Sequence, residues 1–172
     1  MSDYITVIVD GKEFKFKPIP NIIEERKIRS EMANILTRGY EEILDLENLI
    51  SEAYTRHLQH NEDQYGKEEF GQMYKRYLEI IKLRKNAKGE EKEKLDAEFL
   101  EMTNKIDNNK HFSRFIELNQ EKSFLENYAI MRITCVSKPI GFEFGKDGQK
   151  DFELKILNEL IEKKNQVIDI KN

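Results

Sequence analysis

The sequence predicts a mainly α-helical domain that begins with a β-hairpin and carries a protruding, charged helical pair. Residues 4–17 alternate in polarity around an Asp-Gly pair, and most of the later chain carries apolar residues at helical spacing. Residues 88–94 are almost all charged, which is typical of a solvated segment. We expect a single domain, residues 1–172, with these parts: a hairpin at 1–20, a helical core at 21–85 and 110–165, and a peripheral charged helical insertion at about 86–109.

The hairpin is predicted by Asp10-Gly11, because both residues tolerate the positive φ angles of a two-residue type I′ turn. With this pair as the loop, three cross-strand pairs follow: Val9 with Lys12, Val7 with Phe14, and Ile5 with Phe16. One face of the hairpin is then apolar, and an isolated hairpin is only marginally stable in water. We therefore expect this face to pack on a helix or on a second copy of the chain.

The next part of the chain is expected to form three helices. Asn21 is a candidate N-cap with Glu24 as its capping-box partner, and Gly39 is a candidate C′ residue for the first helix. A second helix is predicted at about 41–58, followed by a loop at 60–66. The third helix is predicted at about 67–85, with its aromatic side chains on one face.

The second half of the chain is also predicted to be mainly helical. The charged run at 88–94 is interpreted as a solvated helix–helix connection, and a narrow apolar stripe from Leu95 to Ile106 indicates one arm of an antiparallel pair. A buried central helix is expected from about 111 to Val136, closed by Pro139. Turns follow, then a last helix from about Asp151, then a frayed tail at 165–172.

Composition limits the class of partner and the compartment. The chain has 29 basic and 33 acidic residues, a net charge of −4, which gives no electrostatic footprint for nucleic acid. No apolar run is long enough to cross a membrane, and the N-terminus does not resemble a signal peptide. Cys135 is the single cysteine, so no internal disulfide can form. We expect a cytoplasmic protein that binds neither nucleic acid nor membrane.

The candidates for chemistry are few. His57 and His60 lie three residues apart near acidic residues, but a metal site needs three or four converging ligands, so a packed His57 is the favoured interpretation. Cys135 has no activating neighbour and is interpreted as a buried structural thiol. Aromatic and basic residues mix at 70–85, a combination that can bind single-stranded nucleic acid. Helical spacing places the rings on one face and the charges largely on the other, which favours core packing. We expect no catalytic, metal or cofactor-binding residue, and no enzyme.

The two ends of the chain together resemble a known family. The N-terminal pattern is Ile-x-Val-x-Val-Asp-Gly-Lys-x-Phe-x-Phe-x-Pro-Ile, followed by a capped helix. The C-terminal pattern is a buried helix, then Pro139-Ile-Gly-Phe-Glu-Phe-Gly145, then a helix rich in leucine and isoleucine. These patterns, over residues 4–38 and 122–162, are similar to the tail assembly chaperones of long-tailed bacteriophages and prophages.

The resemblance implies a non-enzymatic chaperone that binds the tape-measure protein, the tail tube subunit, or both, in the host cytoplasm. An amphipathic segment of the partner would lie in an apolar groove, and tube subunits would later displace the chaperone. We expect seven aromatic residues to contact the partner: Phe14, Phe16, Phe70, Tyr74, Tyr77, Phe142 and Phe144. The chain is also a possible homo-oligomer. The alternatives are a structural or scaffolding protein of a virion or phage-like particle, and an enzyme or regulator whose site forms only in the folded chain.

Overall fold

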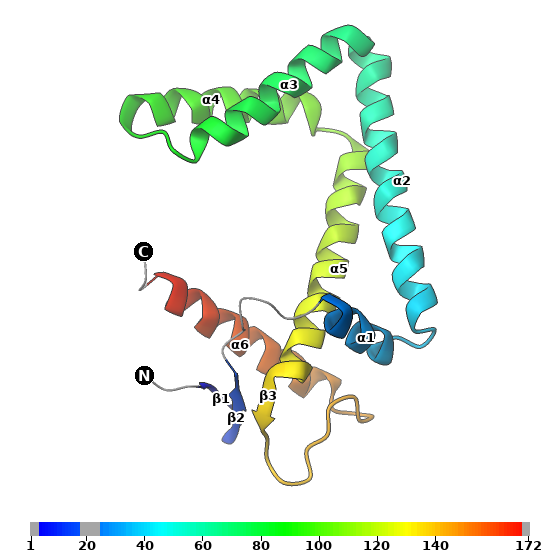
Figure 1. The fold of residues 1–172 in the computed structure, drawn as a ribbon, viewed down its shortest axis with the longest axis vertical. Coiled ribbons are helices and arrows are strands. Elements are labelled where there is room, and N and C mark those ends of the chain that lie inside the picture. The colour runs from blue at the N-terminus through cyan, green and yellow to red at the C-terminus, as the bar shows by residue number, and fades with distance from the viewer. Residues whose placement is uncertain (1–3, 18–24, 170–172) are drawn as a thin grey trace. The chain divides into compact units, whose positions relative to one another are not determined.

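The computed structural model describes residues 4–17 and 25–169, with side chains as far as Lys163. The chain is mainly helical, 73% helix, with an N-terminal antiparallel hairpin, as the sequence predicts (Figure 1). The described elements follow in this order: β1 Ile5–Val9, β2 Lys12–Phe16, α1 Glu25–Ile35, α2 Tyr40–Tyr65, α3 Lys67–Arg84, α4 Gly89–Ile106, α5 Lys110–Thr134, β3 Cys135–Ser137 and α6 Lys150–Asp169.

The chain divides into two compact units. Unit 1 comprises Met1–Asp45 and Glu121–Asn172, and unit 2 comprises Leu46–Gln120. The division falls within α2 and within α5, so each of these helices contributes residues to both units. The expected helical core at 21–85 and 110–165 is therefore shared between the two units.

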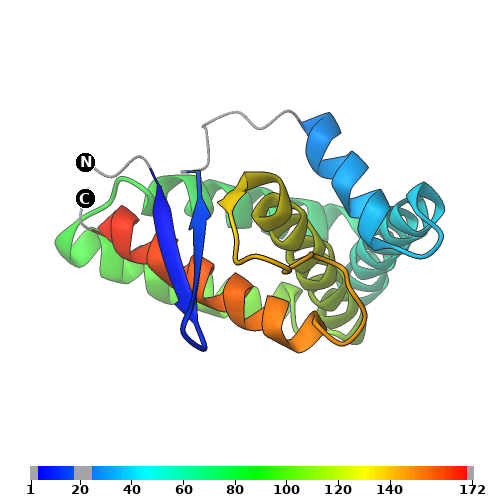
Figure 2. The same cartoon turned by 90° about the horizontal axis from the view of Figure 1, so that it is seen from below.

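The hairpin of unit 1 has the register that the sequence predicts. Ile5 pairs with Phe16, Val7 with Phe14 and Val9 with Lys12. Asp10 and Gly11 form the turn with φ angles of 48° and 76°, the left-handed values that a type I′ turn requires. Figure 2 shows the hairpin lying against α6, and β1 makes extensive contact with this helix.

A third strand completes the sheet and was not expected. The order is β1-β2-β3, and β3 runs antiparallel to β2, with Phe16 opposite Cys135 and Lys15 opposite Ser137. The prediction of a helix to Val136 was wrong at its end: α5 stops at Thr134, whose carbonyl accepts a hydrogen bond from the Lys17 amide at 2.9 Å. The last residues of the apolar run are extended because they pair with the hairpin.

The core of unit 1 lies between the sheet, α5, α6 and the loop before α6. Its buried members come from all of these segments: Val7, Val9, Phe14, Phe16, Tyr128, Met131, Phe142, Ile156, Leu157 and Leu160. A second buried cluster joins α1, the start of α2 and α5: Met32, Ile43, Leu125 and Ala129. Arg132 of α5 forms an ion pair with Glu31 of α1 at 2.9 Å. The expected apolar face of the hairpin is therefore covered by helices of the same unit.

Two boundaries near α1 and α2 differ from the expectation. The proposed cap at Asn21 and Glu24 lies outside the described residues, and Gly39, at φ 60°, lies in the turn between α1 and α2 and not next to the end of α1. The predicted loop at 60–66 was wrong, because α2 continues to Tyr65 and only Gly66, at φ 82°, separates it from α3. Polar residues on an exposed helix face do not end a helix, whereas a glycine with positive φ does.

The charged segment 86–109 is helical, but it is also part of the packing of unit 2. The run at 88–94 forms the exposed beginning of α4 and is not a connection. Leu95 and Ile106 of the same helix are buried. α4 packs on α3, with Arg76 bound to Glu98 at 2.7 Å and Arg84 bound to Asp96 at 2.6 Å. The charged pair of helices thus consists of α3 and α4 and is fixed by both apolar and ionic contacts.

Candidate functional site: two aromatic clusters and a buried polar cluster

The structure divides the seven aromatic candidates between the two units. In unit 1, Phe142 meets Phe14 edge-to-face, with ring centroids 5.0 Å apart and an interplanar angle of 79°. Phe144 meets Phe142 at 5.0 Å and 90°, and Phe152 of α6 lies 5.8 Å from Phe142. We call these four residues, Phe14, Phe142, Phe144 and Phe152, the unit 1 aromatic cluster. Phe16 lies in the same buried core.

Most of these rings are not at the surface. Phe14, Phe16 and Phe142 are buried, and Phe144 is half-buried. Each therefore packs within its own chain in this conformation. A partner would reach Phe14 or Phe142 only if the segment that covers them moved.

That covering segment is the loop from Lys138 to Gln149, which carries Phe142 and Phe144. It is held by turns, in which Phe142 donates to the Pro139 carbonyl and Gln149 donates to the Lys146 carbonyl, each at 3.1 Å. It is also held by Glu153 of α6, whose Oε1 accepts a hydrogen bond from the Gly145 amide at 2.7 Å. Glu153 is fully buried, and burial raises the pKa of its carboxyl, an effect that the hydrogen bond from Gly145 partly opposes. Sequence reasoning missed this residue, although a glutamate on the apolar stripe of the last helix was a visible signal.

In unit 2, the other three candidates follow one another along α3. Phe70 lies 5.7 Å from Tyr74, and Tyr74 stacks on Tyr77 at 6.3 Å. Tyr77 in turn stacks on Phe99 of α4 at 5.5 Å and 12°. Phe70 is buried and the two tyrosines are half-buried, which supports the interpretation of this stripe as packing between helices.

The tyrosine hydroxyls are tied to other elements. The Tyr74 hydroxyl lies 2.6 Å from the Tyr54 hydroxyl of α2. Burial is the main reason that the pKa of Tyr74 is raised to about 12, and the contact with Tyr54 raises it further. The Tyr77 hydroxyl donates to Asp107 Oδ2 at 3.0 Å, and burial raises the pKa of Tyr77 as well. Both tyrosines are therefore neutral hydrogen-bonding groups at physiological pH.

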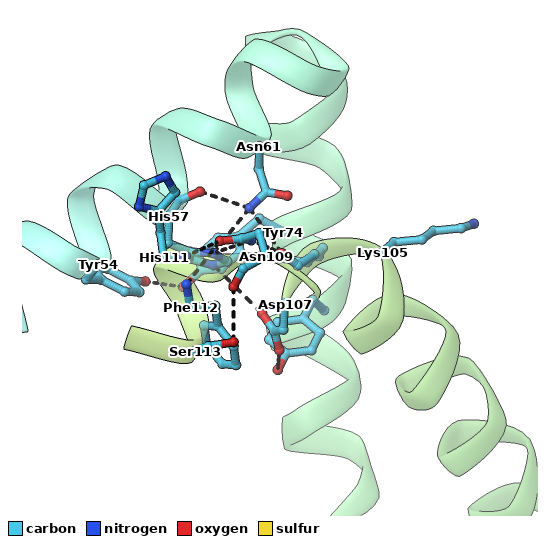
Figure 3. Close-up of polar contacts among 12 residues, drawn as sticks. Tyr54, His57, Asn61, Tyr74, Lys105, Asp107, Asn109, His111, Phe112 and Ser113 are labelled. Carbon is cyan, nitrogen blue, oxygen red and sulfur yellow. Dashed lines mark hydrogen bonds and ion pairs between the residues drawn. The ribbon is translucent and has the colours of Figure 1, made fainter. Parts of the chain in front are cut away.

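A buried polar cluster surrounds His57 (Figure 3). We define it as His57, Asn61, Tyr77, Asp107 and Asn109. Asn61 Nδ2 donates to the carbonyls of His57 and Ile106, at 2.9 and 3.1 Å. Asn109 Nδ2 lies 3.0 Å from His57 Nδ1, and Asn109 Oδ1 accepts from the amides of His111 and Phe112. Asn109 is thus the N-cap of α5 and a partner of His57.

The protonation of this cluster follows from its contacts. An amide NH₂ can only donate, so His57 Nδ1 is an acceptor and the proton of the neutral ring is on Nε2. His57 Nε2 is 3.8 Å from Asp107 Oδ1, too far for a hydrogen bond. Burial lowers the pKa of His57, although Asn109 and Asp107 oppose this, and burial raises the pKa of Asp107. The imidazole is a neutral, packed group, as the sequence indicates.

The polar cluster fits a structural role. A histidine and a carboxylate are the usual acid–base groups of active sites, but a nucleophile or substrate position must lie within hydrogen-bond reach of them. Here the Asn61 amide donates to the Ile106 carbonyl and the Asn109 amide to His57 Nδ1, and these two bonds connect α2 with the end of α4 and the turn before α5. Sequence reasoning identified His57 but missed its partners Asn61, Asp107 and Asn109, of which the last two come from a segment about fifty positions later.

The residues considered for metal binding or for a reactive thiol do not form a site in the part of the chain that the structure describes. No group of three or more His, Cys, Asp or Glu residues that could hold a metal ion occurs within the described residues. Cys135 is half-buried in β3, its thiol lies 3.5 Å from the Ser137 carbonyl, and burial raises its pKa, which disfavours the reactive thiolate. In the part of the chain that the structure describes, no helix has the length and apolar character needed to cross a membrane.

Comparisons with family models, with curated proteins and with solved structures found no match for this chain.

Proposed function

We propose that this chain is a non-enzymatic tail assembly chaperone of a phage or prophage, which binds the tape-measure protein, the tail tube subunit, or both, in the host cytoplasm. One observation carries this proposal. The two sequence patterns that resemble the family lie at opposite ends of the chain, at 4–38 and 122–162, and unit 1 brings residues 1–45 and 121–172 together. Both segments thus lie in one structural unit, which supports the proposal.

The composition of unit 1 supports a binding role. Its aromatic cluster is part of a packed apolar core, and apolar side chains also remain exposed on the unit: Tyr4, Ile8, Tyr40, Leu44, Phe124, Ile133, Val136 and Ile140. Ile140, at the turn of the loop before α6, is fully exposed. An apolar segment of a partner can contact such side chains, and a contact that buries a small area is weak and reversible, as a chaperone that tube subunits displace requires.

The proposal is tested by co-expression with the tape-measure protein encoded in the same genome. We expect the tape-measure protein to be soluble and to co-elute with this chain in size-exclusion chromatography, and to aggregate when expressed alone. Co-expression with an unrelated helical protein of similar charge is the control for a general effect on solubility. Aggregation of the tape-measure protein in both cases, together with no complex with the tube subunit, would contradict the proposal.

A measurement on assembled particles separates the chaperone from a permanent structural protein. A chaperone is released when the tube polymerises, so mass spectrometry of purified particles should find it only in trace amounts. Stoichiometric amounts of this chain in mature particles would instead indicate the structural or scaffolding role.

A further inference from the structure

The loop from Lys138 to Gln149 covers the aromatic interior of unit 1, and its contacts indicate how it is held. Phe142 is inserted among Phe14, Phe152 and the apolar residues of α6, while its neighbour Ile140 is fully exposed. Figure 2 shows this loop between the end of β3 and the start of α6, on the same side of α6 as the sheet. Removal of the loop would uncover rings that otherwise contact only their own chain.

Glu153 is the polar group that connects this loop with α6. Its Oε1 accepts the Gly145 amide, and its Oε2 is buried without a hydrogen-bond partner among the described residues. Gln149, one helical turn earlier, also has a buried Oε1 without such a partner. An ionised Glu153 therefore has a hydrogen bond at Oε1 but, among the described residues, none at the buried Oε2, whereas a proton on Oε2 removes the charge.

Charged groups near the loop do not compensate an ionised Glu153. Arg132 of α5 lies against Gly145, since a Cβ on this glycine would be 3.7 Å from its guanidinium, but Arg132 is already paired with Glu31 of α1. Lys12 of β2 lies over the Phe152 ring, and Lys138 of the loop lies over the Phe144 ring. Gln149, whose carbonyl accepts the Glu153 amide just before α6, is uncharged, and the charged residues Lys150 and Asp151 at the start of α6 are exposed. An unpaired buried carboxylate is costly, and the cost is relieved when water reaches it.

We propose that residues 138–149 form a lid over the unit 1 aromatic cluster, latched by protonated Glu153 through the Gly145 amide, and that ionisation of Glu153 opens the lid. Opening hydrates the carboxylate and exposes Phe14, Phe142 and Phe144. The closed lid binds a proton more tightly than the open lid, so a rise in pH favours opening. This inference depends on the contacts of Glu153 and not on the identity of a partner.

Hydrogen–deuterium exchange of the whole chain tests the latch. Protection of the peptide that contains Gly145 is measured at a series of pH values, in the wild type and in Glu153→Gln, and the ratio of the two removes the pH dependence of the exchange chemistry. We expect opening of the wild-type lid to increase about tenfold per pH unit above the ordinary glutamate pKa, up to the higher pKa of the closed lid, and then to level off. In Glu153→Gln the opening should not depend on pH. Glu143→Gln, which changes an exposed glutamate of the same loop, is the matched control and should behave as the wild type.

Two results would overturn the proposal. One is an equal pH dependence of lid exchange in the wild type and in Glu153→Gln. The other comes from the wild type alone and applies even if Glu153→Gln does not fold: a carbon-13 NMR titration of Glu153 with a midpoint at or below the ordinary value of 4.5. A raised midpoint that coincides with the loss of lid protection supports the latch.

Discussion

The ring of Phe14 in β2 meets the ring of Phe142 in the loop before α6 edge-to-face, with their centroids 5.0 Å apart. This contact joins the N-terminal hairpin to the C-terminal part of unit 1, and both side chains are buried. Edge-to-face pairs of this kind add to the free energy gained from apolar burial. The contact therefore predicts that the hairpin contributes to the stability of the folded chain and is not merely an appendage.

Replacement of Phe14 measures that contribution. Phe14→Ala removes a fully buried ring and should lower the free energy of unfolding by roughly 3–5 kcal/mol. Chemical denaturation provides the measurement. Ile8→Ala, in the same hairpin but on its exposed face, should change stability by less than about 0.5 kcal/mol. A loss below about 1 kcal/mol for Phe14→Ala, accompanied by a loss of self-association, would show that the hairpin acts in oligomerisation.

The hairpin was predictable because residues close together in the sequence determine its turn and its register. Asp10-Gly11 determines the turn, and the alternation of side chains then determines the register, so the pairing of Val7 with Phe14 follows from adjacent residues. β3 was not predictable in this way. The run from Ala129 to Val136 is apolar throughout, and periodicity alone does not distinguish a buried helix from a strand in such a run. Its end is extended because Phe16 and Lys15 of β2 pair with Cys135 and Ser137 of β3.

The candidate site was predictable in part. The sequence identified aromatic residues that cluster, but it does not indicate whether a ring faces its own core or a partner, and Phe14, Phe16, Phe70 and Phe142 face the core. Asp107 and Asn109 escaped sequence reasoning because they lie about fifty positions from His57, and Glu153 was missed although it stands on the apolar stripe of the last helix. Burial of a carboxyl or an imidazole is a property of tertiary packing, and no short motif records it.

Asn109 has two functions that a single substitution should reveal. Asn109→Ala removes the cap of α5 and the shorter hydrogen bond to His57 Nδ1, which then keeps only the 3.4 Å contact with Asn61 Nδ2. We expect a loss of roughly 1–3 kcal/mol in the free energy of unfolding. Asn108→Ala, at the adjacent exposed position, is the matched control and should have little effect. Equal effects of the two variants would show that the cap does not stabilise α5.

Ile106 tests whether α4 belongs to the core of unit 2. Ile106 is fully buried near the end of α4, so Ile106→Ala should cost roughly 2–5 kcal/mol. Leu100→Ala changes a largely exposed side chain of the same helix and should be nearly neutral. Urea denaturation followed by circular dichroism distinguishes these outcomes. A neutral Ile106→Ala would restore the interpretation of residues 86–109 as a peripheral insertion.

The pH dependence of stability should reveal His57. Burial lowers the pKa of His57 in the folded chain below its ordinary value of 6.5, so the unfolded chain binds more protons in the interval between these two values. Stability is therefore greatest above about pH 6.5 and falls as the pH decreases through this interval. Asp107, whose folded-state pKa is raised from 3.8, acts in the opposite direction at pH values above 3.8 and makes the measured slope shallower.

Free energies of unfolding should be measured across this range for the wild type, for His57→Gln and for His60→Gln, which changes an exposed histidine one turn away. We expect His57→Gln to be less stable at neutral pH but less sensitive to acid, and His60→Gln to keep the slope of the wild type. Retention of the full acid sensitivity by His57→Gln would assign that sensitivity to other groups, among them His111, whose pKa is also lowered by loss of solvent and by nearby Lys110.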